Sequence, residues 1–378
     1  MRCRLLLMLL LAPCVLPAGP IRAAGCDPDG KIKYICGMIA PEDLIAVPRS
    51  EWVVASGYTA GGAIHLINSR TYATTQVFPT ASPRLRPDAT TYASCPGPID
   101  PAEKEKFSAH GLNMRPGVGT IHTVYVVHHG LRESVEIFQI DTKPSPPTFA
   151  WIGCAVAPET VSMNSISPVP DGGFVVTNII RRNIPNIQER MRTGGNTGEL
   201  WEWHPEDGWK MVPDSESPTP NGIEVSKDGK WYYVNLWAAG KVMRMSRGQT
   251  PVRKDFVEVD FHPDNIRWQP DGSLYTAGQG GPTPQRISEC LNKFCMDATT
   301  NVARIDPQTL KVQQIIHDSN KEHFISSTTG LHVGKEIWIG TSHSDRIARY
   351  PGGKIDRFVD PGVESDQYPA LLAADVLD

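Results

Sequence analysis

One short pattern returns six times along this chain and restricts its fold more than any other feature. A polar residue, a small or polar residue and then Ile or Leu are followed by a turn and by a segment rich in Trp, Tyr and Val. Successive triplets lie 44 to 67 residues apart, which is room for about four strands each. Six such units predict an all-β protein, a six-bladed β-propeller whose closed ring leaves only short sheet edges. The triplets are Glu42-Asp43-Leu44, His110-Gly111-Leu112, Asn164-Ser165-Ile166, Asn221-Gly222-Ile223, Asp264-Asn265-Ile266 and Thr329-Gly330-Leu331.

The same strands also fit two β-sandwich domains in tandem, which would need a linker near the middle of the chain. The Pro-rich stretches 143–147 and 213–220 are the candidate linkers. Each falls between two repeats, where a loop between blades is also expected, and sustained 3.6-residue periodicity is almost absent. The repeat therefore favours a single propeller over two sandwiches.

The N-terminal residues have the order of a secretory signal peptide. Arg2 and Arg4 precede an apolar run at 5–16 that is too short to span a bilayer as a stable anchor, and small residues follow at 23–25. We therefore divide the chain into a signal peptide at 1–25, an N-terminal extension at 26–36 and the propeller at 37–378, and expect a periplasmic or secreted protein. Ala23-Ala24-Gly25-Cys26 also loosely resembles a lipoprotein cleavage box, so a lipid anchor on Cys26 is the alternative.

Six cysteines follow the signal segment, and export permits them to form disulfides. Proximity in sequence suggests the pairs Cys26–Cys36 and Cys290–Cys295, which leaves Cys95 and Cys154. Six cysteines allow fifteen pairings, so the connectivity stays open at this point. A zinc site is the weaker interpretation, because the chain has no CxxC motif and no close set of Cys and His.

The charge and the apolar pattern exclude two classes of partner. The net charge is −4, and no basic tract interleaved with aromatic residues is present, so nucleic acid is not an expected partner. No segment after the signal is long and apolar enough to be a transmembrane segment. A small molecule is the expected partner.

In a propeller the innermost strands line the central channel, so equivalent positions of the six units converge on the axis. Each of these positions is polar here, although a purely structural core would favour Val, Leu or Ala. Solvated turn residues are the alternative, but each polar residue is followed by Ile or Leu and a strand. Carboxylates and carboxamides supply oxygen ligands, which select calcium or magnesium over zinc or copper. Because calcium accepts six to eight oxygens, the ring predicts a calcium ion. The ring positions are Glu42/Asp43, His110, Asn164, Asn221, Asp264/Asn265 and Thr329.

Two histidines add acid–base chemistry to this ring. His110 lies in the ring itself, and His129 ends the strand that follows it. Imidazole titrates near neutral pH, so a close pair can relay a proton. The structural alternative is that both are merely hydrogen-bonded within the channel.

These motifs resemble the serum paraoxonase/arylesterase branch of the calcium-dependent propeller hydrolases, which is related to the gluconolactonases. The resemblance implies that a catalytic calcium is bound by Glu42, Asn164, Asn221, Asp264 and Asn265. It also implies that His110 is the general base acting on water, with His129 behind it, in the opening of a lactone or the cleavage of an aryl ester. It spans about 37–350 and is strongest in Pro41-Glu42-Asp43-Leu44, His110-Gly111-Leu112, Val126-Val127-His128-His129 with Ser134-Val135-Glu136-Ile137-Phe138, Asn221-Gly222-Ile223 and Asp264-Asn265-Ile266.

The chain departs from that family at two points. The resemblance implies a second, structural calcium, with Asp43, Leu112 and Ser165 as its candidate ligands, but Ser165 stands where those proteins have Asp. A cysteine near the C-terminus that closes the ring in paraoxonases has no counterpart, since Cys295 is the last one. Ring closure is therefore expected to rest on strand pairing alone.

Two other functions remain open from the sequence. One is hydrolysis of a different substrate, such as a sugar lactone or an organophosphate triester. The other is a non-catalytic propeller in which a structural calcium supports a ligand-binding channel. A pure binding module does not need a pair of histidines at the ring, so His110 and His129 favour a calcium-dependent lactonase or arylesterase.

Overall fold

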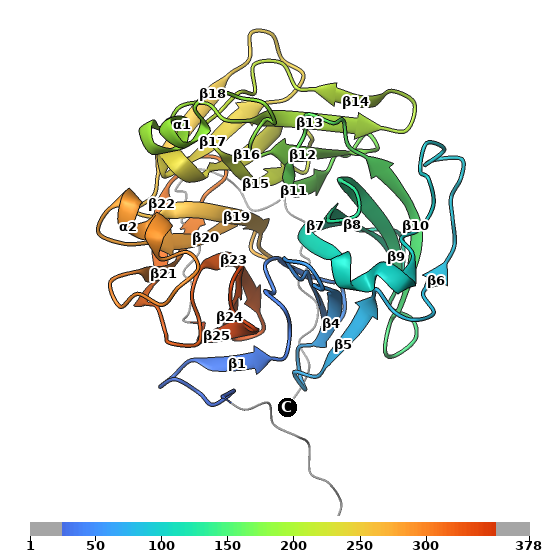
Figure 1. Cartoon of the computed structure of the whole chain (residues 1–378), viewed down its shortest axis with the longest axis horizontal. Helices are drawn as coiled ribbons and strands as arrows, with labels where there is room; N and C mark the ends of the chain where they lie inside the picture. The colour runs from blue at the N-terminus through green and yellow to red at the C-terminus, as the bar shows by residue number, and fades with distance from the viewer. Residues whose placement is uncertain (1–24, 353–378) are drawn as a thin grey trace, which may run out of the picture.

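Six β-sheets surround a central axis in the computed structural model, which describes residues 25–352 (Figure 1). The all-β, six-bladed propeller is thereby confirmed, and the two-sandwich alternative is excluded. The signal peptide predicted at 1–25 and the end of the chain after residue 352 lie almost wholly outside the described residues.

Each blade runs outward from the axis in chain order. The first strands of the six sheets are β2, β7, β11, β15, β19 and β23. Each contains one of the repeated triplets, except that β2 begins at the last residue of its triplet. Blade 1 is β2–β5 (Leu44–Ala46, Trp52–Ala55, Ile64–Asn68, Thr74–Phe78), and blade 2 is β7–β10 (Ser108–Arg115, Ile121–His129, Ser134–Asp141, Thr148–Val156) with β6 (Arg84–Leu85) added outside. Blade 3 is β11–β14 (Met163–Pro168, Phe174–Asn178, Glu199–His204, Gly208–Met211), and blade 4 is β15–β18 (Pro220–Val225, Trp231–Leu236, Lys241–Ser246, Lys254–Glu258). Blade 5 is β19–β22 (His262–Trp268, Leu274–Gly280, Thr299–Ile305, Val312–Ser319), and blade 6 is β23–β25 (Ser327–Val333, Glu336–Thr341, Arg346–Pro351) with β1 (Lys33–Cys36).

Helices are short and lie in the connections. They are η1 (Pro101–Lys106), α1 (Ile187–Thr193), η2 (Trp237–Ala239) and α2 (Pro284–Glu289). Within residues 25–352, none of them has the length and apolar character that a membrane-crossing helix requires.

The hydrophobic core lies between blades and not on the axis. Val54 and Leu66 of blade 1, for example, pack in one cluster with Leu112 and Phe138 of blade 2. Burial of these apolar faces holds neighbouring sheets together. The axis itself is left to polar side chains, as the repeat predicted.

The ring is closed by its first and last strands. Strand β1 pairs antiparallel with β25, with Lys33 opposite Arg349 and Cys36 opposite Arg346. The segment 33–36, which the sequence placed in an N-terminal extension, is therefore the outermost strand of blade 6. Strand pairing closes the ring without a disulfide between its ends, as expected.

A β-bulge marks the ring position in five innermost strands. In β7, β11, β15, β19 and β23, two ring residues lie opposite one residue of the next strand. A bulge of this kind turns a side chain out of the regular alternation, here toward the axis. Glycine is needed at two of the bulges, because a Cβ on Gly111 would overlap the backbone of blade 3 and one on Gly222 that of blade 5.

Residues 25–352 contain three disulfides: Cys26–Cys36, Cys95–Cys154 and Cys290–Cys295. The connectivity suggested by proximity is therefore the one in the structure. A lipid attached to Cys26 by a thioether would require the sulfur that here bonds to Cys36, so the disulfide and the lipid anchor exclude one another.

Candidate active site

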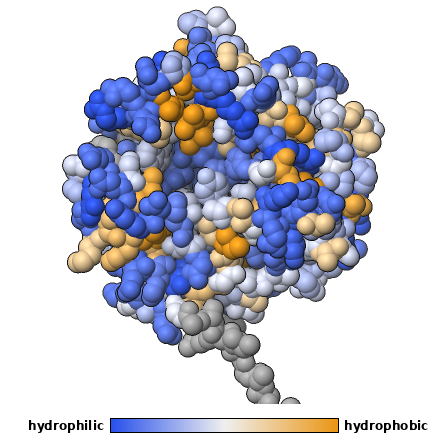
Figure 2. All heavy atoms as spheres, in the orientation of Figure 1, coloured by the Kyte–Doolittle hydropathy of each residue, from blue (hydrophilic) through white to orange (hydrophobic). Residues whose placement is uncertain are grey.

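A hollow lies near the centre of one face of the ring, among mainly hydrophilic side chains (Figure 2). The cavity on the axis has a volume of about 140 Å³. Five of the sequence-predicted site residues line it together, from five different blades. The lining residues are Glu42, Tyr58, His110, Asn164, Asn221, Trp237, Asp264, Gln279, Leu291, Ser342 and His343.

The three asparagines of the ring use their amide nitrogens on neighbouring side chains. Asn265 Nδ2 donates to Glu42 Oε1 at 2.6 Å. Asn164 Nδ2 lies 3.4 Å from His110 Nε2, and Asn221 donates to the Asp264 carboxylate. Each amide group is therefore oriented with its oxygen free of these contacts.

Within the described part of the chain, four buried oxygens of this ring have no hydrogen-bond partner. They are Glu42 Oε2, Asn164 Oδ1, Asn221 Oδ1 and Asn265 Oδ1. A buried polar atom without a partner costs about 1–3 kcal/mol, so such atoms are rare in folded proteins unless they bind something. Four of them in one ring, beside Asp264, form an all-oxygen set suited to a hard cation.

The electrostatics of the ring favour a cation. Burial, together with the carboxylates of Asp43 and Asp264, raises the pKa of Glu42 well above its usual range. Burial likewise raises the pKa of Asp264 to about 7, while hydrogen bonds from Gln279 and Asn221 oppose that rise. A positive ion among these carboxylates would stabilise their charged forms.

The two predicted histidines are in contact, and Glu133 extends this row of hydrogen-bonded side chains. His110 Nδ1 lies 2.9 Å from His129 Nε2, and His129 Nδ1 lies 3.0 Å from Glu133 Oε2. Because a carboxylate accepts and does not donate, the hydrogen between His129 and Glu133 belongs to His129 Nδ1. His129 Nε2 then accepts from His110 Nδ1, which leaves a lone pair on His110 Nε2 at the cavity.

His110 is kept neutral by its surroundings. Burial and the neighbouring His129 lower the pKa of His110 well below its ordinary value. Tyr58 stacks on its ring with centroids 4.1 Å apart, which fixes the imidazole plane. The arrangement provides an oriented proton acceptor beside an oxygen-lined cation site.

The sequence did not identify several residues of this site. Glu133 follows His129 by four positions across the β8–β9 turn, and that hairpin spacing is the one signal that was available. Gln279 donates to Asp264 Oδ2 at 2.8 Å and accepts from Trp237 Nε1 at 2.8 Å. Tyr58 and Leu291 come from loops that match no repeated motif.

The remaining ring positions form a second polar cluster that does not line the cavity. Thr329 Oγ1 donates to Asp43 Oδ1 at 2.9 Å, and Leu112 N donates to Asp43 Oδ2 at 2.8 Å. Asp43 and Ser165 are fully buried. Of the candidate ligands of a second ion, Asp43 and Leu112 are therefore in contact, whereas Ser165 Oγ accepts from Ile223 N, and none of the three lines the cavity.

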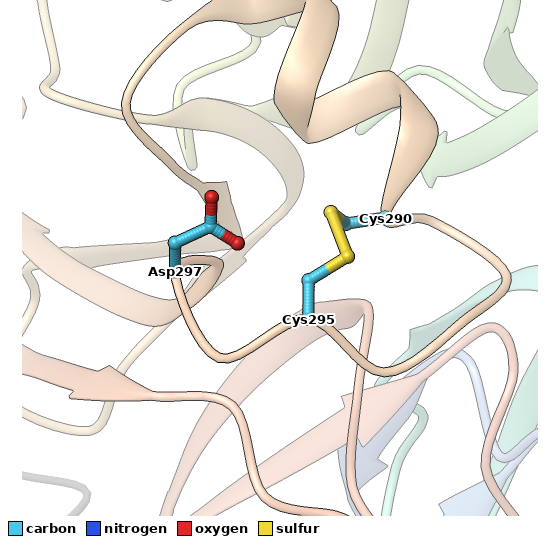
Figure 3. Close-up of side chains that lie close together, drawn as sticks. All are labelled: Cys290, Cys295 and Asp297. Atoms are coloured by element: carbon cyan, nitrogen blue, oxygen red, sulfur yellow. A yellow bond between two sulfur atoms is a disulfide. The ribbon is translucent and has the colours of Figure 1, made fainter.

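One Cys/Asp group on the same side of blade 5 is not a metal centre. Cys290, Cys295 and Asp297 have potential ligand atoms within 4.8 Å of one another. The two sulfurs are bonded to each other (Figure 3), and Arg286 donates to both oxygens of Asp297. The disulfide instead closes the loop after α2, and this loop contributes Leu291 to the cavity wall.

Neither a protein-family model nor a curated protein matches this chain. Among solved structures, a luciferin-regenerating enzyme is similar over 86% of this chain and 97% of its own, at 11% identity and a TM-score of 0.52. A gluconolactonase from Xanthomonas campestris covers 89% and 98%, at 14% identity and a TM-score of 0.49. Virginiamycin B lyase from Staphylococcus aureus covers 84% and 98%, at 12% identity and a TM-score of 0.47. The likeness to the luciferin-regenerating enzyme shows that the two chains share a fold, the six-bladed ring described above.

Proposed function

We propose that this chain is a calcium-dependent hydrolase that opens lactones or cleaves aryl esters at the centre of the propeller. The observation that carries the proposal is the ring of four unpartnered oxygens placed beside an oriented histidine. A ring that served only packing would not leave these oxygens without partners. A binding module would not need a proton acceptor held by two further residues.

The donor set fits calcium. Glu42, Asn164, Asn221, Asp264 and Asn265 would hold the ion, and their two carboxylates match its charge. All five offer oxygen, and water can supply the further ligands that calcium accepts. When bound, calcium would polarise the substrate carbonyl and stabilise the oxyanion that forms on it.

The protein's own residues supply the proton transfer. His110 Nε2 accepts a proton from a water molecule as that water attacks the carbonyl carbon. The resulting imidazolium is stabilised through His129, whose other nitrogen donates to the Glu133 carboxylate. His110 can then return the proton to the leaving alkoxide or phenoxide.

The cavity wall suits a small substrate with an apolar part. Trp237, Leu291 and Tyr58 contribute apolar surface to the same cavity as the ring oxygens. Trp237 is held by the hydrogen bond from its Nε1 atom to Gln279, so its ring is a fixed part of the wall. Trp203 does not line the cavity and serves packing: it stacks on Phe174 within blade 3, with ring centroids 5.1 Å apart.

The test is hydrolysis of γ- and δ-lactones with different acyl tails and of phenyl acetate, before and after chelation and with calcium added back. We expect turnover that chelation abolishes and calcium restores. The best substrate would rank lactone against ester, and a sugar lactone and an organophosphate triester extend the panel to the other candidate substrates. If nothing in the panel were hydrolysed while calcium still raised the melting temperature, the hydrolase proposal would fail in favour of a non-catalytic binding propeller.

A further inference from the structure

A guanidinium group occupies the centre of the second polar cluster. Arg267, on β19, is 1% exposed, and one of its terminal nitrogens donates both to Asp43 Oδ2 and to the carbonyl oxygen of Leu112, the latter at 2.7 Å. Its other terminal nitrogen donates to the carbonyl oxygen of Ile266 at 2.8 Å and lies 3.5 Å from Glu224 Oε1. Two of the three residues that the sequence offered to a second ion, Asp43 and Leu112, therefore already contact a cation through their oxygens.

The carboxylate oxygens beside Arg267 have hydrogen-bond partners, in contrast to the four unpartnered oxygens of the ring, although Arg267 Nε itself has none among the described residues. Asp43 Oδ1 accepts from Leu44 N and from Thr329 Oγ1, both at 2.9 Å. Glu224 Oε2 accepts from Ser167 Oγ at 3.1 Å, and Oε1 accepts from Asn113 Nδ2 at 3.2 Å. Among the described residues, the buried oxygens without a partner include none of Asp43, Ser165 or Glu224. This cluster offers no free donor set to a metal.

The cluster already contains a cation, which offsets part of the negative charge of its carboxylates. Burying an arginine is costly unless its charge is paired and its hydrogen bonds are made. Asp43 and Glu224 provide two carboxylates beside it, and the guanidinium offsets one of these two negative charges. A divalent cation could enter only if the guanidinium left.

We propose that Arg267 is a built-in cation that takes the place of a second metal ion, so that this propeller holds one exchangeable divalent cation and no structural one. The guanidinium links innermost strands of four blades, through Asp43 in blade 1, Leu112 in blade 2, Glu224 in blade 4 and its own strand in blade 5. Because this cation is covalently part of the chain, chelation cannot remove it. The centre of the ring therefore stays assembled when the exchangeable ion in the cavity is lost.

The experiment counts calcium ions per folded chain by equilibrium dialysis and records the melting temperature in calcium and in chelator. The native protein should bind one ion. The Asp264→Asn variant, which alters the oxygen ring at the cavity and not the Arg267 cluster, should bind none while remaining folded. Arg267→Ala should lower the melting temperature in chelator by roughly 5–10 °C, the effect of leaving buried carboxylates unpaired. Arg267→Ala should also bind one additional ion, and this ion should remain when Asp264→Asn is combined with it. Calcium should restore much of the stability that Arg267→Ala loses.

Arg304→Ala is the matched control. Arg304 is equally buried, at 2% exposure, and pairs with Asp271 in a turn of blade 5, away from the axis. This variant should lose stability without gaining an ion or a response to calcium. Arg267→Lys keeps a cation and should bind the same number of ions as the native protein, which preserves the comparison if Arg267→Ala does not fold.

A calcium ion that stays on the Asp264→Asn protein would overturn the inference. An Arg267→Lys protein that bound a second ion would also overturn it, and so would a folded Arg267→Ala protein that bound no additional ion. Absence of lactone or ester turnover with the expected ion counts would contradict the proposed function alone, since the role of Arg267 does not depend on hydrolysis.

Discussion

Glu133 Oε2 lies 3.0 Å from His129 Nδ1, on the side of the imidazole opposite His110. The other carboxylate oxygen, Oε1, accepts a 2.7 Å hydrogen bond from Met163 N, the residue before Asn164. One side chain thus connects the turn that follows His129 to the strand that carries Asn164, a proposed calcium ligand. The proton arrangement of the pair depends on this carboxylate.

Glu133→Gln should reduce turnover on the order of 10- to 100-fold, as is found for residues that orient a catalytic group through a hydrogen bond. A glutamine can donate to His129 Nδ1, and the reversed arrangement would place the proton on His110 Nε2, where the lone pair is needed. Calcium affinity should be unchanged, and the pH dependence of kcat/KM should shift. Arg182→Ala is the control, because Arg182 contacts the same carboxylate at 3.3 Å but is half-exposed. Equal losses in the two variants would argue against a proton-orienting role.

His110→Gln should reduce kcat by about 10²- to 10⁴-fold, the usual contribution of a general base. The increase in melting temperature on adding calcium should remain, because no proposed ligand is removed. His122→Gln is the matched control, since His122 is buried in β8, the strand that also carries His129, and does not line the cavity. Unchanged lactone turnover in His110→Gln would show that the base is another group.

Asp264→Asn should remove both turnover and the stabilisation by calcium. An ion that binds only the folded state stabilises it by about 2.7 kcal/mol at one hundred times its dissociation constant. Thermal unfolding at increasing calcium concentration measures this effect directly. If the variant kept the native dependence on calcium, the ion would have to bind outside the ring.

Acid should destabilise the fold through His128. Burial lowers the pKa of His128 to about 3, against about 6.5 for an exposed histidine. The unfolded chain therefore takes up a proton first as the pH falls, and the free energy of unfolding should drop by up to about 1.4 kcal/mol per pH unit below pH 6.5. His128→Phe should make the profile shallower between pH 6.5 and pH 4, at the cost of the hydrogen bond to the Ser108 carbonyl. Parallel profiles for the two proteins, measured by urea unfolding, would contradict this.

The disulfides should differ in their contribution to stability. Cys95–Cys154 has a sequence separation of 59 residues and Cys290–Cys295 one of only 5. The loss of chain entropy in the unfolded state therefore stabilises the fold by about 4 kcal/mol for the longer link and about 2 kcal/mol for the shorter one. Replacing both cysteines of the longer link by Ser should therefore lower the melting temperature more. The same change in the shorter link should chiefly raise KM, because that loop carries Leu291 into the cavity. An unchanged KM would show that the loop does not contribute to substrate binding.

The fold was predictable because its strongest determinant is local and repeated. Each ring residue is followed by Ile or Leu, which keeps the next side chain in the core between blades, and this alternation is visible in the sequence. Gly111 and Gly222 are part of the same signal, since only glycine allows the innermost strands to approach so closely at these bulges. The convergence of Glu42, Asn164 and Asp264 follows from ring geometry once six units are recognised.

The residues that were missed act through contacts made only in three dimensions. Arg267 is two positions after a predicted ligand, but nothing in the sequence shows that its side chain meets Asp43, which is 224 residues away. Strand β1 could not be assigned to blade 6 from its own four residues, because its partner lies at the other end of the chain. Non-local pairing of this kind leaves no local pattern.

The pairing of β1 with β25 also sets the order of events during synthesis. The two strands are about 310 residues apart, so five blades and most of the sixth can be complete while the ring is still open. The last strand must emerge from the ribosome before the first strand has a partner, and contacts so distant in sequence form slowly. Until then, blade 6 presents an unpaired edge that another chain can join. The time between emergence of the first and last strands is therefore the period in which this protein is most exposed to aggregation.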